Sequence, residues 1–274
     1  MDAPMTKQKQ AAIGKFGHLL RHWRKLRRLS QLELAGEANV SARHLSFLES
    51  GRSQPSREMV QQLGVALDLP LEERNVLHVA AGFVPPYGNR EQAAEDIPHV
   101  RQALDFMLRQ QEPYPAIVID GHWDIRLRND ATKRMFSVFR QSYDVEPAIA
   151  DNAMHTVFHP KALRQFILNW EEFAGGMIQI LHREVAQGSR ISAQLLQEIM
   201  AYPGLSVFSK PARAPETASP IMTMQLQKGY LRLDFFSTFT TFAMPADAAL
   251  QQLKIECFYP ADDATAEIAR KLAP

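Results

Sequence analysis

The sequence of 274 residues contains one cysteine, Cys257, and no run of eighteen apolar residues. A single cysteine cannot form a disulfide within the chain, which is typical of proteins in a reducing compartment. Without a long apolar run the sequence predicts no membrane-spanning helix. The N-terminus also lacks the basic, apolar and small-residue succession of a signal peptide. We therefore expect a cytoplasmic protein that does not associate with membranes.

Motifs of common enzymes and metal sites are also absent. The sequence has no Gly-x-Ser-x-Gly, no His-Glu-x-x-His, no phosphate loop, no dinucleotide fingerprint and no haem-attachment motif. His155 and His159 have helical spacing with Asp151 nearby, but Pro160 interrupts the helix and no third ligand follows at a diagnostic spacing. We predict no catalytic residues, no metal and no cofactor, and we do not expect an enzyme.

Positive charge is concentrated at one end of the chain. Residues 1–57 contain eleven Lys and Arg against four Asp and Glu, whereas the whole chain carries a net charge of +1. Such a surplus favours binding to a polyanion, although a basic block alone can also be a solvated face.

The first 84 residues have the periodicity of a small helical bundle. Ser30 and Glu33 form a capping-box pattern that starts one helix, and Ser41 can cap the next. Asn39, between these helices, tolerates the left-handed conformation that a tight turn requires. Further helices are expected at 57–67 and 71–81. Apolar residues at three- and four-residue steps would form the interior: Phe16, Leu19, Leu20, Trp23, Leu26, Leu34, Ala38, Leu45 and Leu48.

Residues 14–83 resemble the Cro/cI-type helix-turn-helix domain of the XRE family, with matches at Ser30-Gln31, Leu34-Ala35, Val40-Ser41 and 48–52. The resemblance implies that the helix after Ser41 enters the major groove of an operator bound by a homodimer. It implies base contacts from Ala42, Arg43, His44 and Phe47, and phosphate contacts from Gln31, Ser41, Arg52 and Ser53. Arg24 and Glu49 match a structural pair of the family. Bundles of this kind also serve as dimerisation or protein-binding modules.

A second domain is expected after a Pro- and Gly-rich break at 82–88. We place the DNA-binding domain at 1–84, a linker at 85–95 and the second domain at 96–274. Residues 116–119 predict a buried strand, and Trp123, Ile125 and Leu127 should face one way on the next. A helix capped by Asn129 and a long helix from Pro160 should follow.

Three late strands complete the expected fold, around 222–226, 231–235 and 253–257. On the last of them, Leu253, Ile255 and Cys257 alternate with Lys254 and Glu256, and the apolar residues should face inward. Two strands, helices and then three strands are the order of a PAS-like fold. The sequence thus predicts a multi-domain α plus α/β protein, with a five-helix bundle followed by a PAS-like antiparallel sheet covered by helices.

Residues 95–262 also resemble the MmyB-like ligand-binding domain, through Tyr114–Asp120, Trp123–Ile125 and Asn129–Ala131. The resemblance implies a transcription regulator whose second domain holds a small apolar ligand such as a fatty acid. Packing without such a ligand, as a dimerisation or protein-partner module, is one alternative, and a sensor loaded with a cofactor is another. Phe and Met side chains, which pack irregularly, favour a cavity. We expect the cavity to be lined by Phe136, Phe166, Trp170, Met222, Met224, Leu233, Phe235 and Phe239.

Overall fold

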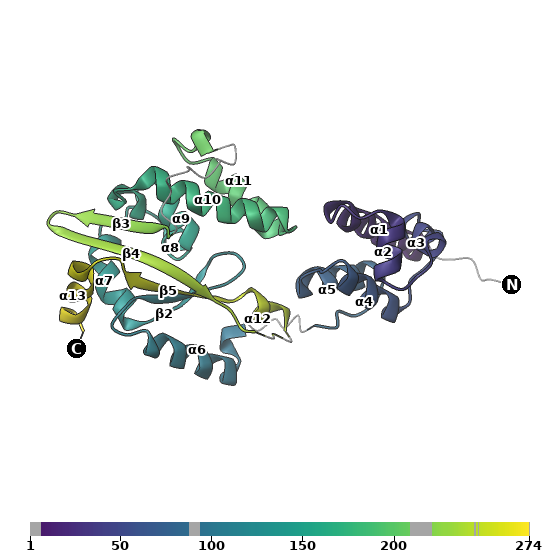
Figure 1. Ribbon diagram of the computed structural model, residues 1–274, viewed down its shortest axis with the longest axis horizontal. Helices are drawn as coiled ribbons and strands as arrows, with labels where there is room; N and C mark the ends of the chain where they lie inside the picture. Colours follow the sequence, from purple (N-terminus) through teal and green to yellow (C-terminus); the bar gives the residue numbers. More distant parts are fainter. Residues whose placement is uncertain (1–6, 88–93, 209–220, 244, 246, 274) are drawn as a thin grey trace. The chain divides into compact units, whose positions relative to one another are not determined.

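The computed structural model describes residues 7–87, 94–208, 221–243, 245 and 247–273, with side chains described from Lys15 onward. The chain forms two compact units, residues 1–91 with 244–251 and residues 92–243 with 252–274 (Figure 1). Part of the predicted linker, residues 88–93, lies outside the described residues. None of the described helices combines the length and the apolar character needed to cross a lipid bilayer.

The first unit contains the five predicted helices. Ser30 forms the predicted capping box with Glu33, and the hydroxyl of Ser41 accepts the amide of His44 at 3.1 Å. Asn39 has the predicted positive φ, 52°, and Gly51, with a φ of 71°, follows the third helix. These local signals give the bounds α1 Lys7–Leu26, α2 Gln31–Glu37, α3 Ala42–Glu49, α4 Arg57–Ala66 and α5 Leu71–Ala80.

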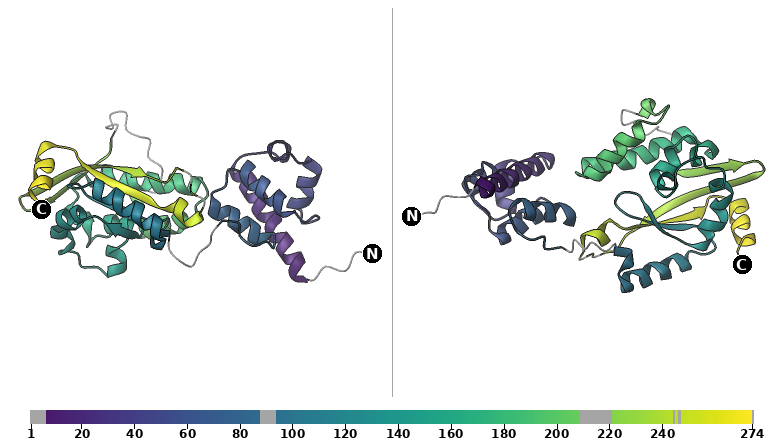
Figure 2. Two further views of the ribbon diagram at one scale, coloured as in Figure 1. Left: turned by 90° about the horizontal axis from the view of Figure 1, so that it is seen from below. Right: turned by 180° about the vertical axis from the view of Figure 1, so that it is seen from behind.

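The second unit is built on an antiparallel sheet with the strand order β2-β1-β5-β4-β3. Its main core lies between one face of the sheet and helices α7, α9, α10 and α11. Helix α6 packs against β1 on the other face, and α13 packs against β4 and β5. Figure 1 shows α10 and α11 on one side of the sheet and α6 on the other, and the left view of Figure 2 shows α6 crossing it.

The strands are β1 Ala116–Ile119, β2 Ile125–Arg128, β3 Thr223–Lys228, β4 Leu231–Thr240 and β5 Lys254–Pro260. The α-helices that follow α5 in the sequence are α6 Pro98–Gln110, α7 Asp130–Arg140, α8 Pro147–Ala150, α9 Ala153–Phe158, α10 Trp170–Ala186, α11 Arg190–Met200, α12 Ala248–Gln252 and α13 Asp263–Lys271. Nearly all of α12 belongs to the first unit. Short 3-10 helices occupy Ala94–Asp96, Leu163–Phe166 and Ser206–Phe208.

The prediction of one long helix from Pro160 is wrong for the residues before Trp170. A 3-10 turn is followed by Ile167, which forms a β-bridge with Leu226, and α10 begins only at Trp170. The amide of Asn169 holds this bend, because it donates to the carbonyl of Thr223 at 2.8 Å and accepts from the amide of Gln225 at 3.0 Å. Pairing with the sheet edge thus overrides the helical spacing of the apolar residues.

The predicted facing of two strands also needs correction. A register shift between Val118 and Ile119 breaks the alternation of β2, so that Ile125 and Arg128, rather than Ile125 and Leu127, share the α7 face. On β5, the register with Ile117 places Glu256 on that face, and Ile255 lies on the opposite one. Both faces of the sheet are covered by helices, so the positions of apolar residues in the sequence did not identify the face that packs against α7.

Candidate DNA interface and ligand cavity

Helices α1, α2 and α3 are tied together by one buried carboxylate. The side chain of Glu49, at the end of α3, is 1% exposed and accepts Arg24 Nε at 2.6 Å and Arg24 Nη2 at 2.9 Å. It also accepts the amide of Gln31 at 2.9 Å. Burial alone would raise the pKa of Glu49, but these hydrogen bonds hold it below its ordinary value. The predicted structural role of Arg24 and Glu49 agrees with this geometry.

A glycine lets α1 approach α3 closely. A Cβ on Gly17 would lie 2.6 Å from the carbonyl oxygen of Leu48 and 2.8 Å from that of Glu49. Backbone atoms cannot give way as a flexible side chain can, so this crossing requires glycine. Helix α3 is therefore held firmly on the bundle, which leaves its other side to present recognition residues.

The residues predicted to contact DNA lie on α2, on α3 and in the loop after α3. Ser41, Arg43 and Arg52 are exposed, whereas the other five are half-buried. The guanidinium of Arg43 lies over the ring of Phe47, 5.5 Å from its centroid. Gln31 was expected to contact a phosphate, but its side-chain amide donates to Glu49 and links Gln31 to the framework of the bundle. The half-buried residues are Gln31, Ala42, His44, Phe47 and Ser53.

A cavity of about 350 Å³ lies between the sheet and the helices of the second unit. Its size falls within the range of small-molecule sites, and its lining is largely apolar. Aromatic and aliphatic side chains come from the sheet and from α7, α9 and α10: Ile117, Ile125, Phe136, Val157, Phe173, Met177, Met224 and Phe258.

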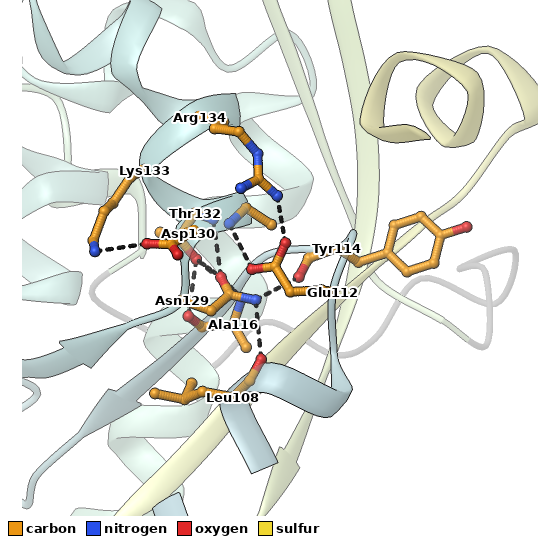
Figure 3. Close-up of polar contacts among 10 residues, drawn as sticks. Leu108, Glu112, Tyr114, Ala116, Asn129, Asp130, Thr132, Lys133 and Arg134 are labelled. Atoms are coloured by element: carbon orange, nitrogen blue, oxygen red, sulfur yellow. Dashed lines mark hydrogen bonds and ion pairs between the residues drawn. The ribbon is translucent and has the colours of Figure 1, made fainter. Parts of the chain in front are cut away.

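Helix α7, which supplies one wall of the cavity, is fixed at its start by Asn129 (Figure 3). The Asn129 side chain accepts the amides of Thr132 at 2.9 Å and Ala116 at 3.0 Å, and it donates to the carbonyl of Tyr114 at 2.8 Å. Glu112 accepts the amide of Ala131 at 2.9 Å and forms an ion pair with the guanidinium of Arg134 on the same helix. The predicted cap is thus also a link between α7 and the sheet, which positions the wall.

Basic side chains line another part of the cavity. Arg128 and Arg140 both contact Oδ1 of Asp151, at 2.8 and 2.7 Å, so that two positive charges share one carboxylate. The hydroxyl-bearing side chain of Tyr143 also lines this cavity, and burial raises its pKa well above its usual range. A neutral phenol and two guanidinium groups are donors that suit an anionic head group.

One acidic side chain lines the cavity from the sheet. Glu256 is 7% exposed, and among the described residues its Oε1 accepts a hydrogen bond from the hydroxyl of Ser237 at 2.7 Å. Burial raises the pKa of this carboxyl to about 7, and the hydrogen bond from Ser237 offsets only part of that effect. Its surroundings therefore differ from those of the fully bonded Glu49.

Two of the predicted ligand residues, Phe136 and Met224, line this cavity. Phe235 and Leu233 are fully buried in the surrounding core, where the ring of Phe235 stacks on Phe136 at 5.9 Å. The other four lie away from the cavity lining. Phe166 packs on Phe139, Trp170 on Phe158, Met222 beside Gly176, and Phe239, which is 39% exposed, on Trp123.

Sequence reasoning missed the polar lining residues. Arg128 lay outside the predicted set because the irregular register of β2 turns it toward α7, and no local signal marks that shift. Glu256 was missed because it alternates with Ile255 and Cys257, which were expected inside. His155 contacts the hydroxyl of Tyr202 at 2.8 Å, and no group of three potential metal ligands occurs among the described residues.

The geometry agrees with what comparisons with known proteins show. A model of a helix-turn-helix domain family matches residues 15–77, and residues 100–272 match the MmyB-like transcription regulator ligand binding domain. The chain is therefore a DNA-binding transcription regulator of the helix-turn-helix class. It belongs to the family with an MmyB-like ligand-binding domain, the match to which spans most of its length.

Two solved structures resemble part of the chain. The restriction-modification controller protein C.AhdI from Aeromonas hydrophila is 31% identical, with 23% of this chain and 94% of that chain covered and a TM-score of 0.22. The clp gene regulator ClgR from C. glutamicum is 30% identical, with coverages of 29% and 94% and a TM-score of 0.23. A comparison with curated proteins gives no match.

Proposed function

We propose that this regulator binds operator DNA through α3 and senses an amphipathic small molecule with an anionic head, such as a fatty acid, in the cavity of its second domain. The observation that carries the proposal is the apolar cavity of about 350 Å³ with Arg128 and Arg140 in its lining. An acyl chain would contact the apolar walls, and its carboxylate would take hydrogen bonds from these guanidinium groups and Tyr143. The PAS-like interpretation is supported by the order of two strands, helices and three strands.

The DNA-binding part of the proposal rests on residues of α3 and its flanks, of which Ser41, Arg43 and Arg52 are exposed. Arg43 would read a guanine edge, and Ala42, His44 and Phe47 would contact bases beside it. Ser41, Arg52, Ser53 and Gln31 would contact phosphates, supported by the basic surplus of residues 1–57. One recognition helix offers few base contacts, so a homodimer on two half-sites about 34–36 Å apart is expected. Light scattering of the complex should show two chains per operator.

The ligand-sensing part is tested by thermal-shift titration of delipidated protein with saturated fatty acids of graded length. A ligand that binds only the folded state should stabilise it by about 2.7 kcal/mol at a hundredfold excess over its dissociation constant. Ala153→Phe and Val157→Phe place a ring in the cavity and should abolish the shift. Phe239→Trp, which changes a residue outside the cavity lining, should keep it.

Flat melting curves for the whole series, with no lipid extracted from freshly purified protein, would contradict the sensor proposal. That outcome would favour the other interpretation, in which the second domain is a dimerisation or protein-partner module. If the sensor proposal holds, the ligand should also change operator affinity, and by linkage operator DNA should change ligand affinity by the same factor. The operator for this measurement can be selected from random duplexes with the full chain.

A further inference from the structure

We propose that Glu256, together with Ser237, is a specificity-determining pair that selects a ligand bearing a hydroxyl group at mid-chain in addition to its anionic head. This inference rests on the proposed ligand-binding function and adds a chemical class to it. It begins from an acidic group that lines a largely apolar cavity, where a plain acyl chain would have nothing to pair with it.

Apart from Tyr143 at the basic side, the hydroxyl groups that line the cavity already donate hydrogen bonds to backbone carbonyls. Thr132 donates to the carbonyl of Ala116 at 2.8 Å, Ser137 to that of Arg134 at 2.9 Å, and Thr156 to that of Ile149 at 3.0 Å. Among the described residues, Glu256 accepts a hydrogen bond from Ser237, on one of its two oxygens. A carboxylate has about four acceptor positions, so this side chain retains the capacity to bind a ligand donor.

The placement of Glu256 relative to the basic side of the cavity gives the position of the hydroxyl. Arg128 and Glu256 are both cross-strand partners of Ile117, on β2 and β5, and all three line the cavity. Two strand spacings separate their backbones, roughly 10 Å. A ligand whose head group lies at Arg128 would therefore pass Glu256 some way along its chain, not at the carbon next to the carboxylate.

A hydroxyl group fits this position better than an ammonium group. An ammonium group carries donors only and requires several acceptors, whereas a hydroxyl can both donate and accept. The same cavity is lined by Arg128, Lys133 and Arg140, which would repel a cationic ligand. Because burial brings the pKa of Glu256 to about 7, both its protonated and ionised forms are populated near neutral pH, and either can bond a hydroxyl.

The test compares delipidated protein binding to tetradecanoic acid with binding to its isomers hydroxylated near the carboxyl group, at mid-chain and near the methyl end. Titration calorimetry should show the mid-chain isomer binding about tenfold tighter than the parent acid, as expected for a bond to a buried polar group. Glu256→Met should remove this preference and leave the affinity for the parent acid unchanged. Tyr143→Phe, a change in the same cavity at its basic side, should weaken all of the acids and leave the preference intact.

The outcomes separate this inference from the proposed function. Binding of the parent acid with no preference among isomers, or a preference that survives Glu256→Met, would overturn the role of Glu256 while the ligand site stands. Absence of binding by every acid would overturn the proposed function itself. Tighter binding of tetradecylamine than of the acids, lost in Glu256→Met, would overturn the choice of a hydroxyl. Glu256→Gln is the conservative control, because its side chain keeps polar hydrogen-bonding atoms. This variant should keep part of the preference, and its melting curve should show a folded protein.

Discussion

Glu49 in the DNA-binding bundle and Glu256 in the second domain are similarly buried, at 5% and 7% exposure, yet their pKa values move in opposite directions. Glu49 is paired with Arg24 and accepts a hydrogen bond from Gln31, whereas among the described residues Glu256 accepts its hydrogen bond from the hydroxyl of Ser237. Burial is thus not what distinguishes them; their partners are. A carboxylate with satisfied oxygens stabilises a framework, and one with spare acceptor capacity beside a cavity suits a binding site.

The largest expected effect comes from removing the ion pair between Arg24 and the buried carboxylate of Glu49. Arg24→Met should lower the local stability of α1–α3 by about 3 kcal/mol, because a buried charge loses its main partner. Amide hydrogen exchange on the full chain, resolved by peptide, measures this loss.

The matched control is Arg101→Met, which removes an exposed ion pair with Asp105 on α6. Surface pairs of this kind contribute about 0.5 kcal/mol or less, so exchange should change little. Equal effects of the two variants would contradict the structural role assigned to Glu49 and Arg24.

The second prediction concerns pH and the sparsely bonded Glu256. Its folded-state pKa, about 7, lies above its ordinary value of 4.5, so between these values the folded chain retains a proton that the unfolded chain has released. Stability from this group should therefore fall by about 3 kcal/mol as pH rises from 4.5 to 7, and stay level above that. Urea unfolding across this range measures the profile.

Glu256→Gln isolates this contribution, because all other titrating groups are common to both proteins. The unfolding free energy of the variant minus that of the wild type should increase with pH up to about 7, because only the wild type loses this contribution. A difference that is constant across the whole pH range would show that the carboxyl does not titrate in this window.

Smaller effects are expected on the exposed side of the bundle, where recognition residues can change without disturbing the Glu49 network. Arg43→Ala should cost about 1–3 kcal/mol of operator binding and relax specificity at one base pair. Arg52→Ala should weaken binding to all sequences alike and reduce its salt dependence. Affinity titrations against operator variants at several salt concentrations distinguish them, and sequence-independent losses from both would refute the assignment.

The two domains also differ in how far their sequences predicted them. The caps at Ser30, Ser41 and Asn129 and the turn at Asn39 were predicted, because each depends on chemistry within a few residues. The fold class and the resemblance to both families were likewise evident from residue type and spacing.

The inner residues of the second domain depend on the register between distant strands, which no local pattern records. The bend at Ile167, the turned Arg128 and the inward Glu256 all follow from pairing across the sheet. Strong apolar residues such as Leu233 and Phe235 were predicted as ligand contacts, although the structure places them in the packed core. Aromatic content predicted that a core exists, but not where it leaves a cavity.

The most direct test of the account uses the methyl groups of methionine as reporters in the full-length, delipidated protein. Met177 and Met224 line the cavity, Met135 and Met154 lie in the adjacent core, and Met59 packs in the DNA-binding bundle. Titration with tetradecanoic acid, followed by NMR of carbon-13 methyl groups, should shift Met177 and Met224 most and leave Met59 nearly unchanged. Unchanged signals from Met177 and Met224 at saturating acid would contradict a ligand site in this cavity.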